Sequence, residues 1–295
     1  MSVFFSSLKF YTYTSRKFSS ALRSWVAKVS CRSSTSSAQP TVMKKSKSKI
    51  YKIDYSSDFT LVDCIDHRYQ SGKHSEKGLL SSKVELPDDR DAHKFCTTIE
   101  GVFSSKECNK IVERSEEAGF KTALVNVGRG EVHDPDYRNS DRCIIDDCDI
   151  AKAIFERIKD FLPKILNGGS GSSWELVGVN ERMRILRYSD GHFFAKHKDG
   201  SHTRNYDECT FFTLMIYLNS GGGVDFEGGS TNFLSSTFSN GKANHTEYVP
   251  KRGSVLVFDH GLLHEGATLV RGTKYCIRSD VLYKRVSYGL GRTTK

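Results

Sequence analysis

The chain has 295 residues, of which 27% are charged and 37% hydrophobic, proportions that are ordinary for a globular protein. Ten of its 44 Lys and Arg lie within residues 1–50, which contain no Asp or Glu, and the remaining 34 face 35 acidic residues. The net charge of +9 therefore comes from the N-terminal segment, and the rest of the chain lacks the basic surplus that nucleic-acid binding requires. No apolar run approaches the roughly 20 residues of a membrane-spanning helix, so we expect neither a nucleic-acid partner nor a membrane span.

Residues 1–50 are rich in Arg, Lys and Ser, with aromatic and aliphatic residues between them. This composition is typical of an organellar transit peptide and lacks the continuous apolar stretch of a secretory signal, so it predicts a mitochondrial or other organellar protein. The alternative is a disordered basic tail on a cytoplasmic protein, and Met43 could also start a cytosolic form. We expect a lead-in segment over 51–95, one domain over 96–288 and a short tail over 289–295.

Two helices are predicted at the start of the domain. Ser104 followed by Glu107 forms a capping-box pattern, apolar residues then recur at helical spacing, and Gly119 is a suitable stop. In the second helix Asp149 is the expected cap, and residues 167–173 (NGGSGSS) form a loop after it. The apolar stripe of this helix consists of Ile150, Ile154, Phe155, Ile158, Phe161, Leu162 and Ile165.

From Trp174 onward the hydrophobic period changes from that of a helix to that of a strand. Short β-branched and aromatic runs are separated by Gly, Asn, Asp and Pro, and they read MRILRY, TFFTLMIYLN, GGSTNFL, SVLVF and YCIRSDVLY. The pattern predicts a mainly β (α+β) fold, with a double-stranded β-helix (jelly-roll) core buttressed by N-terminal helices. The eight cysteines form no CxxC pair, so free thiols are expected rather than a disulfide or zinc framework.

Five histidines lie in two short stretches, GHFFAKHKDGSH and FDHGLLHEG. Side chains two residues apart on a strand share a face, so His197 and Asp199 are expected to point together while His192 points away. A third ligand from a neighbouring strand would complete a 2-His-1-carboxylate triad, the arrangement that holds Fe(II) with open positions. Taken alone, the H-x-D pair could equally be a polar surface feature.

Four ordered blocks resemble the Fe(II)/2-oxoglutarate dioxygenases of the prolyl 4-hydroxylase-like superfamily, over roughly Val102 to Tyr283. The blocks read RILRYSDGHFFAKHKDG, TLMIYLN, FEGGSTNF and PKRGSVLVFDHGLLHEGATLVRGTKY. The resemblance implies a dioxygenase that uses Fe(2+), 2-oxoglutarate and O2 to hydroxylate a substrate, releasing succinate and CO2. It also implies L-ascorbate as the reductant that restores the iron.

The resemblance assigns roles to individual residues. His197, Asp199 and His264 fall on the metal-ligand positions, and no other catalytic side chain is implied. Lys274 falls where the family places the cation for the far carboxylate of 2-oxoglutarate, and Tyr188 falls where a tyrosine hydroxyl also reaches this cosubstrate. His260 falls where the family has no ligand.

Three arginines are further candidates. Arg278 shares the strand face of Lys274 and is a second cation for 2-oxoglutarate, or else forms a structural ion pair with Asp280 or another acid. Arg138 and Arg142, in the run YRNSDR, could hold an acidic or carbonyl group of the substrate, or else be solvated surface residues.

The identity of the substrate stays open, with a protein side chain and a small molecule both in view. Phe194 and Tyr275 replace the Tyr and Trp of many prolyl hydroxylases, so prolyl hydroxylation is one option among several. The presence of Asp199 favours hydroxylation, because the related halogenases lack this carboxylate. Two other interpretations are a cupin-like metalloprotein that does not use 2-oxoglutarate, for which Lys274 has no role, and a non-catalytic binding module.

Overall fold

The computed structural model describes residues 59–66, 78–128, 130–168, 172–239 and 242–286, all within one compact unit, Ser48–Lys295. The segment predicted as a transit peptide and the predicted tail lie outside these residues. No helix in the described part of the chain is both long and apolar enough to cross a membrane.

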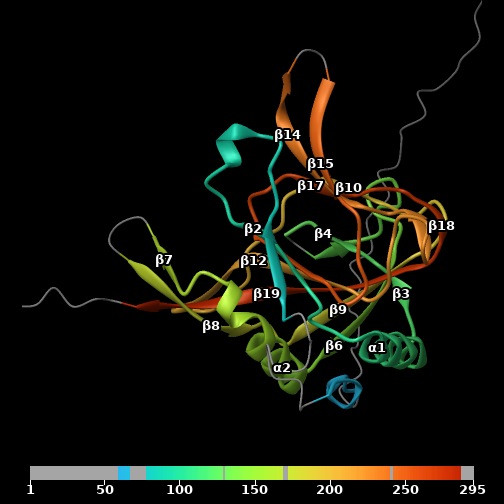
Figure 1. Cartoon of the computed structure of the whole chain (residues 1–295), viewed down its shortest axis with the longest axis horizontal. Coiled ribbons are helices and arrows are strands. Elements are labelled where there is room, and N and C mark those ends of the chain that lie inside the picture. Colours follow the sequence, from blue (N-terminus) through green and yellow to red (C-terminus); the bar gives the residue numbers. More distant parts are fainter. Residues whose placement is uncertain (1–58, 67–77, 129, 169–171, 240–241, 287–295) are drawn as a thin grey trace, which may run out of the picture. The chain divides into compact units, whose positions relative to one another are not determined.

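The main feature is an eleven-stranded antiparallel sheet (Figure 1). Along its main path the strands run β1 (Leu80–Lys83), β2 (Cys96–Glu100), β16 (Val255–Asp259), β12 (Glu208–Tyr217), β19 (Lys274–Val286), β9 (Arg182–Tyr188), β6 (Asp141–Asp146) and β3 (Lys121–Thr122). Three more strands join it, β11 (Thr203–Asn205) beside β12, β8 (Ser173–Val179) beside β19, and β7 (Ile165–Asn167) beside β8.

A second antiparallel sheet has four strands, in the order β10 (Phe194–His197), β17 (His264–Gly266), β14 (Thr231–Ser239) and β15 (Lys242–Tyr248). Two small ribbons pair β13 (Phe226–Gly228) with β18 (Leu269–Gly272), and β4 (Val125–Asn126) with β5 (Glu131–Val132). The predicted mainly β fold with a jelly-roll core is confirmed, and the five predicted runs coincide with β9, β12, β14, β16 and β19.

Helix α1 (Ser105–Ala118) begins and ends where the sequence predicts. The Ser104 hydroxyl accepts from the Glu107 backbone N–H at 3.2 Å, and the Glu107 carboxylate accepts from the Ser104 N–H at 2.7 Å. Gly119 closes the helix with φ +84°, a conformation that costs glycine little because it has no Cβ.

Helix α2 (Cys148–Ile158) is capped by Asp147, and the prediction of Asp149 as the cap is wrong. The Asp147 carboxylate accepts from the N–H groups of Asp149 and Ile150. Its other oxygen accepts at 2.7 Å from the N–H of Leu61, so one residue caps the helix and fastens the lead-in segment to it.

The second helix is shorter than predicted, because α2 ends at Ile158 whereas the predicted apolar stripe runs on to Ile165. The chain leaves the helix after Ile158 and passes through a 3-10 turn, η3 (Lys159–Phe161), before entering β7. Two further 3-10 turns, η1 (Val62–Cys64) and η2 (Asp89–Asp91), lie in the lead-in segment together with β1.

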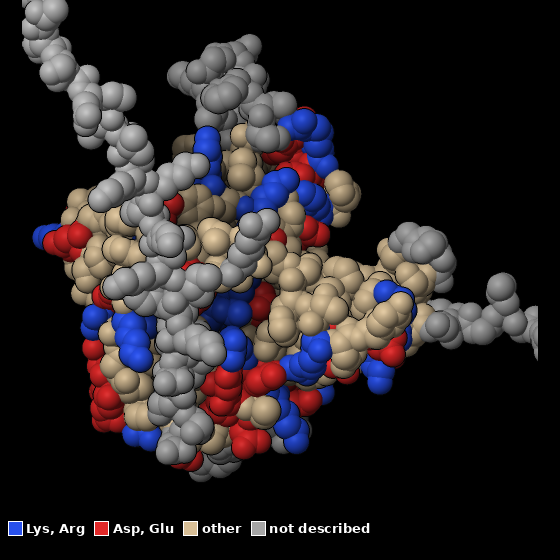
Figure 2. All heavy atoms as spheres, turned by 180° about the vertical axis from the view of Figure 1, so that it is seen from behind, with Lys and Arg blue, Asp and Glu red and all other residues tan. Residues whose placement is uncertain are grey.

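The large sheet buries both of its faces, because successive strand residues point to opposite sides. In β16, Val255 and Val257 belong to a core shared with α1 and α2, whereas Leu256 and Phe258 belong to a second core shared with the small sheet. Figure 1 shows both helices on one side of the large sheet and the β14–β15 hairpin on the other. Charged side chains of both signs are interspersed over the face drawn in Figure 2.

Candidate metal centre

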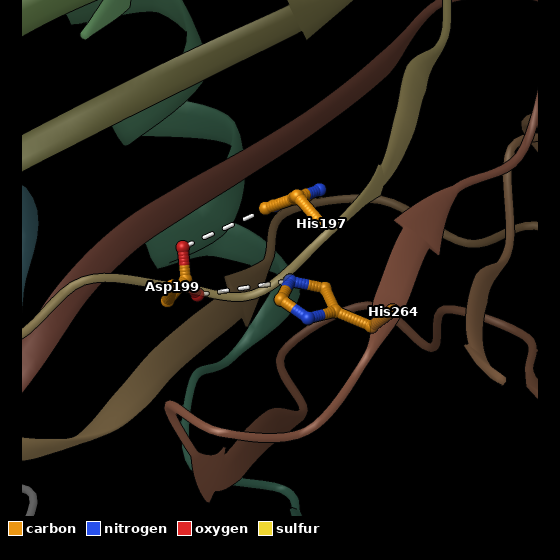
Figure 3. A group of neighbouring side chains, drawn as sticks. All are labelled: His197, Asp199 and His264. Carbon is orange, nitrogen blue, oxygen red and sulfur yellow. Dashed lines mark ion pairs between the residues drawn. The ribbon is translucent and has the colours of Figure 1, made fainter. Parts of the chain in front are cut away.

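Three side chains meet between the two sheets. β10 and β17 pair with His197 directly opposite His264, and Asp199 follows two residues after His197. The Nε2 atoms of His197 and His264 lie 3.9 Å and 3.6 Å from the two oxygens of Asp199, and the three candidate ligand atoms lie within 4.8 Å of one another (Figure 3). Ligands bound side by side at about 2.1 Å from one ion lie ~3 Å apart, so small rotations of the side chains suffice to bind a metal.

Hydrogen bonds outside this group fix its orientation. The Nδ1 atom of His197 lies 2.7 Å from the carbonyl oxygen of Ala195, and Nδ1 of His264 lies 3.0 Å from that of Leu262. Each Nε2 is therefore left facing the centre, the usual arrangement for metal-binding histidines. The hydroxyl of Thr213 donates to Asp199 at 2.5 Å, and nothing in the sequence marked this residue.

The electrostatics keep the three groups in their metal-binding protonation states. Burial, together with the neighbouring His264, lowers the pKa of His197 to about 4, and burial also lowers the pKa of His264. Burial alone would raise the pKa of Asp199, but the charge of Arg278, joined at low pH by those of the protonated imidazoles, outweighs it and lowers this pKa. Near neutral pH the site offers two neutral imidazoles and a carboxylate, which bind a cation without first losing protons.

Lys274 lies in the same cavity, deep between the sheets. Its side chain is 3% exposed, and its Nζ donates at 2.5 Å to the carbonyl oxygen of Gly229. The ring centroid of Tyr188, itself buried, lies 5.3 Å from this Nζ. No carboxylate of the described residues forms an ion pair with Lys274, so its charge is buried without a counter-charge, which is costly until an anion binds.

The metal group and Lys274 line one cavity of about 440 Å³, a size typical of small-molecule sites. Gly229 is needed at its inner end, because a Cβ there would lie 2.7 Å from a methyl group of Leu269 and the backbone φ is +65°. A cavity with three candidate metal ligands at one point and an unpaired buried lysine at another suits a metal together with an acidic cosubstrate.

Residues 183–279 match the family model of the 2OG-Fe(II) oxygenase superfamily, a stretch that contains His197, Asp199, His264 and Lys274. These residues form a 2OG-Fe(II) oxygenase domain. The protein is a 2-oxoglutarate-dependent dioxygenase, and the family uses Fe(2+), 2-oxoglutarate and O2. The side chains present fit this pair of ligands, since the triad provides the donor set for Fe(II) and Lys274 provides the cation for a carboxylate.

Solved structures similar to this oxygenase include three prolyl hydroxylases. The viral collagen prolyl hydroxylase of Paramecium Bursaria Chlorella virus-1 is 21% identical, with 65% of this chain and 97% of that chain covered and a TM-score of 0.41. A Pseudomonas putida prolyl-4-hydroxylase is 17% identical (65% and 95% covered, TM-score 0.43). A Trichoplax adhaerens prolyl hydroxylase in complex with a hypoxia inducible factor peptide is also 17% identical (66% and 87% covered, TM-score 0.45). No curated protein matches the chain.

Arg278 forms the ion pair with Asp280 that the sequence offered as one of its two roles. Its Nη2 lies 3.2 Å from an oxygen of Asp199 and 3.0 Å from one of Asp280. Arg184 and His260 also contact Asp280, at 3.5 Å and 3.3 Å. In this oxygenase Arg278 therefore orients the candidate metal ligand Asp199, and His260 is a neighbour of the triad, outside the group of candidate ligands.

Arg138 and Arg142 are both buried and line the cavity, so their interpretation as solvated surface residues is wrong. Arg142 forms an ion pair at 2.8 Å with Glu131. Arg138 donates from Nε to the hydroxyl of Ser140 at 3.0 Å. The run YRNSDR thus contributes side chains to the site of the oxygenase, as its candidate role as a substrate contact requires.

Proposed function

We propose that this oxygenase hydroxylates a C–H bond of its substrate, with Fe(II) bound by His197, Asp199 and His264. When bound, the iron couples the oxidative decarboxylation of 2-oxoglutarate by O2, which yields succinate and CO2, to the insertion of one oxygen atom into the substrate. The protein holds the metal, orients the cosubstrate and keeps bulk water away. The presence of the Asp199 carboxylate supports hydroxylation as the outcome.

Lys274 is the observation that carries this proposal. Its ammonium group would bind the far carboxylate of 2-oxoglutarate, exchanging an unpaired buried charge for a charge-assisted hydrogen bond. The adjacent Tyr188 would line the same end of the cosubstrate. A cupin-like metalloprotein would have no reason to bury an unpaired lysine in its metal cavity, and a degenerate binding module would have no reason to keep the lysine and the triad together.

Anaerobic purification followed by an assay of succinate release tests the proposal. We expect succinate only when Fe(II), 2-oxoglutarate and O2 are all present, and we expect L-ascorbate to prolong turnover by keeping the iron reduced. For the variant Lys274→Met the matched control is Lys196→Met, which removes an exposed lysine of the strand that carries His197. Release of succinate by protein stripped of metal with a chelator, or none under any condition from the folded protein, would contradict the proposal.

A further inference from the structure

The charged side chains of the cavity are not balanced. It is lined by the cationic residues Arg138, Arg142, Arg184, Lys198, Lys274 and Arg278, and by the acidic residues Glu131, Asp199, Glu265 and Asp280. Arg142 has Glu131, and Arg278 and Arg184 share Asp280. Two buried cations of the lining, Lys274 and Arg138, have no ion-pair partner among the described residues.

Arg138 is held firmly beside the metal centre. Its guanidinium carbon lies 4.6 Å from the ring centroid of Phe194, and the Phe194 ring stacks on that of His197 with 3.7 Å between centroids. Its backbone N–H donates to the carbonyl oxygen of Asp134 at 2.9 Å, and the residue forms an isolated β-bridge with Phe194. The side chain is 8% exposed, and Ser140 provides its hydrogen-bond acceptor.

The proposed ligands leave Arg138 unmatched. The lining carries six cationic and four acidic side chains, and doubly charged 2-oxoglutarate balances only the charge of Fe(2+). Arg138 stays protonated in a protein, and its positive charge is therefore uncompensated even in the loaded site. Because a buried charge is costly unless it is paired, we expect Arg138 to bind an anion other than 2-oxoglutarate.

We propose that the substrate is a small carboxylic acid whose carboxylate binds the guanidinium of Arg138 beside Phe194, an inference that rests on the proposed function. A planar guanidinium matches a carboxylate through two parallel hydrogen bonds. Arg138 contacts Phe194, and Phe194 stacks on His197, so the guanidinium that would anchor the substrate lies near the metal site. Arg138 thereby fixes which carbon of the substrate faces the iron.

The test uses protein loaded with Mn(II), in place of Fe(II), and saturated with 2-oxoglutarate under anaerobic conditions. Monocarboxylates from propionate to octanoate, and the matching uncharged amides, are the probes. Paramagnetic broadening of their proton NMR signals reports binding close to the metal. We expect broadening for at least one carboxylate but not for its amide, and we expect Arg138→Met to weaken this binding ~10-fold or more.

Three further variants, used beside Arg138→Met, separate the explanations. Arg138→Lys keeps the positive charge but not the planar guanidinium, so it should retain part of the binding of the carboxylate. Arg182→Met removes an arginine that is paired with Asp146 and lies outside the cavity lining, and should change nothing. Calorimetric titration of 2-oxoglutarate should give the same affinity in Arg138→Met as in the wild type, whereas Lys274→Met should weaken it.

Two outcomes would overturn the inference. If Arg138→Met weakens 2-oxoglutarate as much as Lys274→Met does, Arg138 is a cosubstrate ligand. If amides, or an uncharged blocked prolyl peptide, broaden as strongly as the carboxylates, or if no carboxylate broadens, the anchor is absent. Failure of the wild type to bind 2-oxoglutarate would instead refute the proposed function itself.

Discussion

Two buried arginines show how the scaffold and the site of this oxygenase differ. Arg157, on α2, donates to the Glu107 carboxylate at 2.7 Å and to the carbonyl oxygen of Val102 at 3.0 Å. Arg138, in the cavity, is similarly buried but donates only to a hydroxyl among the described residues. The buried arginine of the scaffold is therefore neutralised by an acidic side chain of the same chain. The buried arginine of the site has no such partner among the described residues, which lowers stability but leaves its charge available to a ligand.

The sharpest division between scaffold and site is expected for the metal ligands. Asp199→Ala and His264→Ala should each lower succinate release ~1000-fold or more, because even residues that only support a ligand typically matter 10–100-fold. His133→Ala, at an exposed position outside the cavity lining, should change the rate less than about threefold. Stopped assays with excess Fe(II) measure the rates. Comparable losses in all three variants would mean that the triad has no special role.

Removing Arg157 should damage the scaffold. Arg157→Met leaves the Glu107 carboxylate buried without its partner and should lower the free energy of unfolding by about 3–5 kcal/mol. Arg138→Met leaves no acidic side chain unpaired, so the free energy of unfolding should stay the same or rise. Urea unfolding of both variants provides the comparison. Equal destabilisation would show that Arg138 is part of the scaffold.

The cosubstrate lysine should affect binding more than folding. Lys274→Met removes one charge-assisted hydrogen bond to 2-oxoglutarate, worth about 1.5–3 kcal/mol, and should raise the KM for 2-oxoglutarate ~10–100-fold. The folded protein should be no less stable, because the lost charge had no counter-charge among the described residues and only a carbonyl oxygen as its hydrogen-bond acceptor. A KM equal to that of Lys196→Met would show that Lys274 does not bind 2-oxoglutarate.

The smallest expected effect is a pH dependence of the scaffold pair. Burial alone would raise the pKa of Glu107, but hydrogen bonds from Arg157 and from the backbone of Asp66 and Ser104 outweigh it and lower the pKa below its ordinary 4.5. The stability that this carboxylate contributes is thus present above about pH 4.5 and lost as the pH falls through the folded-state pKa. Urea unfolding between pH 7 and about pH 3 should show a smaller loss of stability in Glu107→Gln than in the wild type.

The sequence predicted the metal centre because its information is local. The H-x-D spacing, a second histidine on another strand and the capping box of α1 each follow from short patterns, and the register of β10 against β17 brings His197 opposite His264. The cap of α2 is Asp147, two residues before the predicted Asp149. Asp147 also accepts a hydrogen bond from the distant Leu61, a contact that no local pattern contains.

The charges of the cavity could not be predicted in the same way. Arg138 lies in a polar run that resembles a surface loop, and it is buried by contact with Phe194, more than fifty positions away. Likewise, Arg278 was equally suited to the cosubstrate or to an acid, and only the fold brings it to both Asp199 and Asp280. Such pairings depend on which strands face one another across the two sheets.

Anaerobic titration of the Fe(II)-loaded protein with 2-oxoglutarate, followed by visible absorption, tests the central claim most directly. Chelation of the metal by the cosubstrate should produce a weak charge-transfer band in the wild type. Lys274→Met should require far more 2-oxoglutarate to reach the same band, and Asp199→Ala should not give it. A folded wild-type protein that binds Fe(II) but develops no band at saturating 2-oxoglutarate would contradict the account.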